Sequence, residues 1–343
     1  MQRSLSRRLP ASLNVVNVIG VVIVAVVLVY LVPRVGRGGS DFLVRILIIG
    51  VTTGAVYALI ALGYTMVYGI IELINFAHGD VFTLGAFISL PLLAVFGLTE
   101  GTALGLAQWL RLGLVFLITM LITGTINVGI ERFAYRPLRN APRLAPLITA
   151  VGMSFLLEGA MYVWKGAVNL HYPDLLPDSS IALGPASIRV KDVVVVAAAI
   201  GLVIGLGLFI SRSKLGKAMR ATAQDRDAAQ LMGINIDRTI SATFFIGAVL
   251  AGAGGIIYGL YINSVNNTLG FTAGLYAFTA AVFGGIGNIP GAALGGLMIG
   301  IISAVSDGYG PNTSLTSVWV FAVLILVLTL RPTGLLGMRV PEK

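Results

Sequence analysis

Long apolar runs alternate with short polar stretches along the whole chain, and most of the runs are long enough to cross a membrane. A helix needs about 20 residues to span about 30 Å of hydrocarbon. Ten runs come near this length, and the eighth is the weakest because it is short and rich in glycine. They cover residues 14–32, 43–69, 78–98, 111–130, 145–164, 192–211, 240–262, 272–288, 290–307 and 315–330. The pattern predicts an all-α polytopic membrane protein of about ten transmembrane helices, one or two of them broken or re-entrant.

Composition agrees with a membrane protein and leaves little room for another domain. Hydrophobic residues make up 57% of the 343 residues and charged residues only 11%, whereas a soluble domain has about 25% charged residues. Spanning helices in this number use roughly 200 residues, so the loops are short and no soluble catalytic domain fits. The absence of cysteine excludes a disulfide framework, and the composition also excludes disordered and collagen-like chains.

Basic residues predict how the helices are oriented. With a cytoplasmic N-terminus, the inside segments are the start of the chain, 131–143, 211–240 and the tail after Leu330, and they hold sixteen of the 23 Lys and Arg residues. Cytoplasmic loops carry such an excess, so we expect both termini in the cytoplasm. Residues 1–40 are then a cytoplasmic tail with an extra first helix, and 338–343 are a second tail. A cleaved signal peptide is disfavoured, because the first run exceeds a signal core and lacks a small-x-small cleavage pattern.

The sequence lacks the usual motifs of nucleotide, metal and nucleic-acid sites. No G-x-x-x-x-G-K-[ST] loop is present, and no basic stretch is interleaved with aromatic residues. The two histidines, His78 and His171, are predicted on opposite sides of the membrane. We therefore expect no catalytic residue, no metal site and no nucleic-acid partner. An intramembrane hydrolase that uses His78 with Asp80 stays a minor alternative.

One polar segment, Ile74–Asp80, interrupts the apolar pattern between the second and third runs. It contains Asn75, His78 and Asp80 and follows Glu72 closely. Such groups are costly in lipid unless they face water or protein. A broken helix here would expose backbone dipoles to a substrate, whereas a tight cytoplasmic turn would satisfy its own backbone through Asn75 and His78. Both interpretations stay open.

A second polar segment, 214–235, joins the sixth and seventh runs on the predicted cytoplasmic side. It favours one helix from Leu215 to Met232 that ends at Gly233, because glycine readily takes the left-handed conformation of a helix stop. One edge is mixed apolar and contains Leu215, Met219, Ala223, Ala229 and Met232. The opposite edge is polar and contains Lys217, Arg220, Gln224 and Asp227. This pattern predicts either a helix that docks into the groove of a partner or a solvated loop whose basic side faces lipid headgroups.

Small residues recur at the spacing that lets membrane helices touch closely. The pairs are Gly201/Gly205, Gly255/Gly259, Gly291/Gly295 and Gly296/Gly300. They predict close packing inside this subunit or at an interface with another. The glycine-rich run 284–291 has the wrong spacing for a dinucleotide fingerprint and lies between apolar runs, so it predicts a helix break at the membrane.

Five motifs carry a resemblance to one family of transporters. The run Asp227-Ala228-Ala229-x-x-x-Gly233 resembles the E-A-A-x-x-x-G cytoplasmic loop of ATP-binding cassette (ABC) importer permeases, with Asp in the usual Glu position. The wider chain from 41 to 337 is similar to the LivH-like branched-chain amino acid permease family. The other motifs that carry this similarity are Gly54-x-x-Tyr57-Ala58-Leu59-x-Ala61-Leu62-Gly63, Asn75-Phe-Ala-His-Gly-Asp80, Ala251-Gly252-x-x-Gly255 and the run from Gly284 to Gly291.

The resemblance implies a permease domain over 41–337, with a cytoplasmic coupling loop at 212–238 and no ATPase site of its own. It implies a second, LivM-like permease subunit, two ATPase subunits that use ATP and Mg, an extracytoplasmic substrate-binding protein, surrounding lipid and a bacterial cytoplasmic (inner) membrane. This chain would bind no cofactor. The residues expected to couple to the ATPase are Arg220, Asp225, Asp227, Ala228, Ala229 and Gly233, and those expected along the translocation pathway are Tyr57, Asn75, His78, Asp80 and Asn288.

Two alternatives to amino-acid import remain. Urea and short-amide permeases look similar over the same segments, including an N-x-A-H-G-[DE] run. An ion-coupled secondary transporter would need ionisable groups inside the spans, and Glu72, Asp80 and Glu158 are the candidates. For Glu158 we favour pairing with a neighbouring helix over a place in the pathway.

Overall fold

The computed structural model describes residues 15–102, 104–139, 141–142, 144–183, 186–331 and 333–337. Its helices are α1 (Val15–Ile71), α2 (His78–Val95), α3 (Leu106–Ile130), α4 (Leu144–Lys165), α5 (Val190–Arg212), α6 (Lys214–Gln224), α7 (Arg226–Leu231), α8 (Ile236–Ile262), α9 (Leu269–Gly284), α10 (Ile289–Tyr309) and α11 (Thr316–Leu330). Short elements complete the fold: a π-helical turn η2 (Glu131–Tyr135), 3-10 turns η3 (Arg136–Leu138) and η4 (Thr313–Leu315), and strands β1 (Leu170–His171), β2 (Ser180–Leu183), β3 (Ala186–Arg189) and β4 (Ser264–Val265).

The architecture confirms an all-α polytopic membrane protein. Within the described residues, eight helices are long and apolar enough to cross a membrane. The run predicted at 272–288 forms α9, whose 16 residues fall short of a full crossing. The first predicted run lies in α1 before a break in helical geometry at Gly39. The total of ten crossings and the domain boundaries stay predictions, and both chain ends lie outside the described residues.

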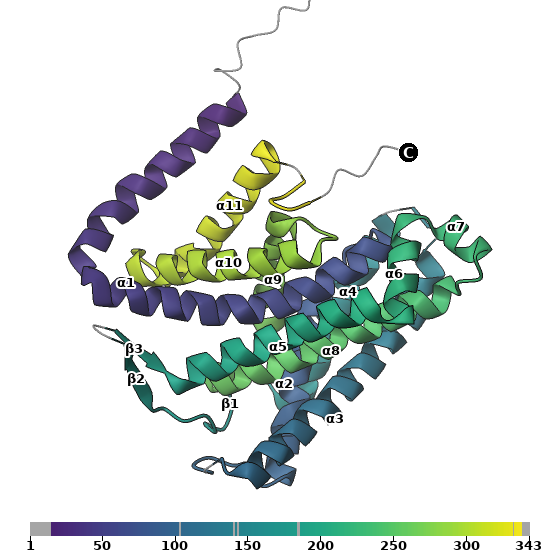
Figure 1. Cartoon of the computed structure of the whole chain (residues 1–343), viewed down its shortest axis with the longest axis horizontal. Helices are drawn as coiled ribbons and strands as arrows, with labels where there is room; N and C mark the ends of the chain where they lie inside the picture. The colour runs from purple at the N-terminus through teal and green to yellow at the C-terminus, as the bar shows by residue number, and fades with distance from the viewer. Residues whose placement is uncertain are drawn as a thin grey trace, which may run out of the picture.

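The long helices run side by side and place the predicted cytoplasmic segments at one end. α5, α8 and the later part of α1 contact one another, with α6 and α7 at one end and the β2–β3 hairpin at the other (Figure 1). Arg136 and Arg139 line the same cavity as Asp227 of α7. The basic segments on either side of α4 and α5 therefore share one end, as the charge pattern predicts.

The segment between α4 and α5 is held by ion pairs at the opposite end. Glu100 accepts hydrogen bonds from the backbone N–H of Asp174 (2.9 Å) and from Nε2 of His171 (3.0 Å), and these bonds lower the pKa of Glu100. The buried ammonium of Lys191 lies 3.1 Å from Asp178 and lowers the pKa of that carboxyl. A two-strand pair, β1 with β4, closes the segment against the end of α8.

Glycines bring helix backbones into direct contact in the centre of the bundle. A Cβ on Gly255 of α8 would overlap the carbonyl oxygen of Phe82 on α2, and a Cβ on Gly300 of α10 would overlap the backbone of Gly54 on α1. Three of the four small-residue pairs thus pack inside this subunit. The fourth differs, because no described atom lies within 4 Å of a Cβ built on Gly201 or Gly205.

We expect Gly255→Ala to lower the stability of the purified protein by about 1–3 kcal/mol, because the methyl group overlaps a backbone atom that cannot rotate away. Gly201→Ala is the matched control. It adds the same methyl group to a helix in open space, and it lowers the conformational entropy that the backbone loses on folding. Thermal unfolding in detergent measures both. Equal unfolding midpoints for the two variants would contradict the close α2–α8 contact.

Candidate functional site: a cytoplasmic helix pair and a buried polar turn

The cytoplasmic segment forms two helices where the sequence predicted one. The prediction of a continuous helix from Leu215 to Met232 is wrong at Asp225. The extended backbone of Asp225, with a φ of −156° and a ψ of 115°, ends α6. Its carboxylate accepts hydrogen bonds from the N–H groups of Asp227 (2.9 Å) and Ala228 (3.0 Å) and so caps the start of α7. Aspartate is a preferred N-cap residue because it satisfies the free N–H groups of the first turn.

The predicted stop at Gly233 is confirmed. Gly233 has a φ of +82°, and the N–H of Ile234 reaches back to the carbonyl of Ala229 at 3.0 Å. This is the left-handed closure that glycine permits. α7 is therefore a short helix with a defined start and a defined end.

Two arginines fasten the helix pair to the membrane-spanning helices. Arg226 donates from Nη2 to the carbonyl of Ile70 (2.8 Å) in the last turn of α1. Arg220 donates to the carbonyls of Ile210 and Ser211 at the end of α5. A cation is favourable at a helix C-terminus because free carbonyls and the helix dipole are negative there. Arg226 was missed by the sequence analysis, and the role of Arg220 in ATPase coupling stays a prediction.

The outward surface of α7 is apolar at its tip. The side chains of Leu231 and Met232 are 89% and 82% exposed, and Asp227 and Ala228 are exposed beside them. Ala229, in contrast, is buried. The apolar edge predicted from the sequence is thus divided, with one part packed inward and one part left open to a partner.

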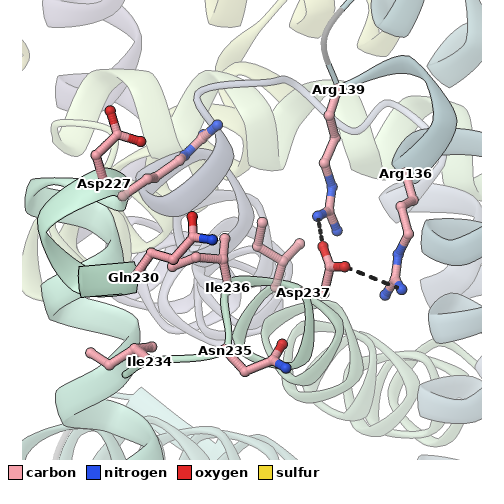
Figure 2. Close-up of a pocket in the computed structure, with 10 residues that line it drawn as sticks. Arg136, Arg139, Asp227, Gln230, Ile234, Asn235, Ile236 and Asp237 are labelled. Carbon is pink, nitrogen blue, oxygen red and sulfur yellow. Dashed lines mark hydrogen bonds and ion pairs between the residues drawn. The ribbon is translucent and has the colours of Figure 1, made fainter. Parts of the chain in front are cut away.

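A buried carboxylate organises the junction between α3 and α8. Glu131 is fully buried and accepts hydrogen bonds from Arg136 (3.1 Å), from Arg139 and from the hydroxyl of Ser241 (2.7 Å). Both arginines also reach Asp237 in the first turn of α8, as the dashed lines in Figure 2 show. A buried charge is tolerated when it is paired and hydrogen-bonded in this way. The sequence analysis missed this network because its members are about 100 residues apart.

A cavity of about 510 Å³ separates this network from α7. Arg136, Arg139 and Asp237 line one side of it, and Asp227 and Gln230 of α7 line the other (Figure 2). The cavity therefore lies between the exposed helix and the ion pairs that hold α3 to α8.

The polar turn before α2 lies deep in the bundle. The imidazole ring of His78 fits between Gly63 of α1 and Gly247 of α8, where side chains are absent. α8 rises about 16 Å between Ile236 and Gly247, at about 1.5 Å per residue. Half of a bilayer's hydrocarbon is about 15 Å thick. His78 therefore lies well inside the bundle, about 16 Å along α8 from its first residue, and its predicted place near one face of the membrane stays a prediction.

The turn does not gather its polar side chains into one site. Asn75 accepts a hydrogen bond from the hydroxyl of Tyr135 at 2.7 Å, His78 points between α1 and α8, and Asp80 accepts one from Ser154 of α4. His78 and Asp80 are two residues apart on a helix and so face different directions. The turn and the start of α2 thus contact five elements, namely η2, α1, α8, α4 and α9.

Several polar atoms of the turn have no hydrogen-bond partner among the described residues. They are Nδ2 of Asn75, both ring nitrogens of His78 and Oδ1 of Asp80. Each such buried atom costs about 1–3 kcal/mol. The backbone does form the predicted turn, because the N–H of His78 donates to the carbonyl of Asn75 at 3.1 Å. The turn is nevertheless buried rather than solvated.

The remaining candidates lie in separate places. Tyr57 packs edge-on against Tyr276 of α9, with ring centroids 5.7 Å apart. Asn288 caps α10 and donates to the carbonyl of Leu336 at 2.6 Å, at the predicted helix break. Glu72 is exposed. Glu158 forms no ion pair with any residue that the structure describes, and its expected pairing with a neighbouring helix stays a prediction.

The apolar helices, with an anchored and capped helix pair exposed at one end of the bundle, describe a multi-pass membrane protein. The sequence matches the family described as branched-chain amino acid transport system / permease component over residues 46–328, and the chain belongs to this family.

Three relatives are similar over most of their length. The high-affinity branched-chain amino acid transport system permease protein BraD of Pseudomonas aeruginosa is 44% identical over 87% of this chain and 96% of its own. LivH of Escherichia coli K12, which carries the same description, is 43% identical over 86% of this chain and 95% of its own. A probable LivH of Methanocaldococcus jannaschii is 27% identical over 81% of this chain and 88% of its own. No solved structure matches the chain.

We expect Gly63→Ala to destabilise the protein because its methyl group overlaps the ring of His78, and His78→Ala to remove that overlap. The free energy of unfolding of the double variant should therefore exceed the value expected from adding the two single effects by about 0.5–3 kcal/mol. Thermal unfolding measures it. Gly69→Ala with His78→Ala is the control, because a Cβ on Gly69 makes only ordinary contact at 3.5 Å with Gly287. Additive effects in both pairs would contradict the position of the ring.

Proposed function

We propose that this chain is the permease subunit of an ATP-driven ABC importer and forms the membrane pathway for branched-chain or other neutral amino acids. The observation that carries the proposal is the 42–44% identity, over most of the chain, to permeases of high-affinity branched-chain amino acid transport systems. The protein is a multi-pass membrane protein, and we place it in the bacterial inner membrane.

ATP hydrolysis belongs to separate subunits in this proposal. Two ATPase subunits with ATP and Mg, a second LivM-like permease and an extracytoplasmic substrate-binding protein complete the importer. α7 is the element that the ATPase binds. The support for this role is geometric: capping residues and arginines fix the helix on one side, while Leu231 and Met232 present an apolar tip on the other. Movement of the ATPase dimer would then shift the permease between two states.

We expect Leu231→Asp and Met232→Asp to reduce copurification of the ATPase subunits by about tenfold or more, which corresponds to about 1.4 kcal/mol of binding free energy. Gly233→Val should act in the same direction because its φ of +82° strains any other residue. Val95→Asp is the control, since that side chain is 79% exposed at the far end of α2. Quantitative pull-down of the tagged chain from membranes measures the effect, and undiminished copurification would overturn the docking role of α7.

Uptake by the reconstituted complex tests the substrate. We expect radiolabelled leucine uptake that requires ATP and is displaced by excess valine or isoleucine but not by urea. Displacement by urea would favour the short-amide alternative, in line with the N-x-A-H-G-[DE] run. Uptake by the single purified chain under an ion gradient, without ATP, would instead establish a secondary transporter that uses Asp80 and Glu158.

A further inference from the structure

The turn η2 contacts two polar features of the site. At its first residue, Glu131 is buried in the ion-pair network with α8. At its last residue, the hydroxyl of Tyr135 donates to Asn75 in the turn before α2. The ring of Tyr135 is 1% exposed and lies 5.5 Å from the ring of Phe244 on α8. One five-residue turn thus joins the cytoplasmic network to the middle of the bundle.

The π-helical geometry gives η2 this double contact. A π-turn widens the helix by one residue and is often found at functional sites. Here it lets α3 end with Glu131 facing Ser241 and Tyr135 facing deeper, toward Phe244. The two arginines that follow in η3 return to Glu131 and to Asp237.

We propose that Tyr135 is a positioning residue that transmits movement of α7 and α8 to the start of α2, through its hydrogen bond to Asn75. The inference rests on the proposed function, in which an ATPase moves α7. It concerns a different step, namely how that movement reaches the centre of the bundle.

The first link is the short connection between α7 and α8. Only the residues between Leu231 and Ile236 separate the two helices, so a displacement of α7 acts directly on Asp237. Arg139 holds Asp237 and Glu131 at the same time. Because Glu131 is fully buried, separating it from its arginines would leave a charge without a partner, which is strongly unfavourable. η2 therefore follows α8.

The second link is the hydrogen bonding of the turn. Gly79 meets Gly270 and Gly274 of α9 backbone to backbone, and Phe76 packs against Phe278 of α9 with ring centroids 5.9 Å apart, so the turn also contacts α9. Nδ2 of Asn75 has no hydrogen-bond partner among the described residues, so a rotation of this side chain would break only the hydrogen bond from Tyr135. This bond is therefore the contact through which η2 acts on the turn.

The test uses the complete importer in proteoliposomes with its binding protein, and measures both substrate uptake and ATP hydrolysis. Tyr135→Phe removes only the hydroxyl group, and we expect it to lower the amount of substrate imported per ATP hydrolysed by about fivefold or more. Copurification of the ATPase subunits and ATP hydrolysis should persist. Tyr172→Phe is the matched control, because Tyr172 is equally buried and its hydroxyl bonds to Ser89 of α2 at 2.8 Å, away from η2. It should leave the ratio unchanged.

Variants of the acceptor separate coupling from general destabilisation. Asn75→Ala removes the acceptor and should reproduce the loss, and combining it with Tyr135→Phe should cause no further loss. An unchanged ratio in Tyr135→Phe, an equal fall in Tyr172→Phe, or additive losses in the double variant would each overturn the inference.

The same preparation separates a failure of the proposed function from a failure of the Tyr135 relay, the path from α8 through η2 to the start of α2. If the ATPase subunits do not copurify with the unmodified chain, the proposed function fails and the relay fails with it. If they copurify and drive uptake, but Tyr135→Phe transports normally, the relay alone is wrong.

Discussion

Backbone contact at glycine is the constraint on which the rest of the structure depends. In a membrane, helix association gains little from the hydrophobic effect, and close van der Waals contact has to provide the attraction. α2 contacts α1, α3, α4, α8 and α9, which is possible because glycines stand at the crossings with α8 and α9. A helix with ordinary side chains at those points would be held away from the centre. The enclosure of α2 in turn explains why its first turn is dry and why its polar groups find so few partners.

The fold divides its charges between the bundle and its cytoplasmic end. Glu131 is buried but fully paired, and Arg220 and Arg226 end on backbone carbonyls. These contacts fix three helix ends with short-range interactions that lipid does not weaken. What remains exposed on α7 and at Met232 is small: two apolar side chains, one carboxylate, one amide and one alanine. A partner that binds there meets a rigid surface, and rigid surfaces lose little conformational entropy on binding.

Local signals in the sequence predicted the parts of the structure that are set locally. Long apolar runs predicted the spanning helices, glycine predicted the stop at Gly233, and the run 284–291 predicted a break that the structure shows between α9 and α10. The break at Asp225 was missed because its neighbours favour helix, and capping by one aspartate outweighs that preference. The burial of His78 between two helices was missed for another reason. It depends on glycines of α1 and α8 that are far away in the chain, and no local pattern reports such a contact.

The place where α2 begins has an electrical consequence. A helix carries about half a positive elementary charge at its N-terminus, and here that charge lies where the surroundings screen it least. Asp80 in the first turn offsets it. The interior of the bundle thus holds an oriented dipole beside the carboxyl group of Asp80, an internal field that a solvent-exposed turn would not sustain.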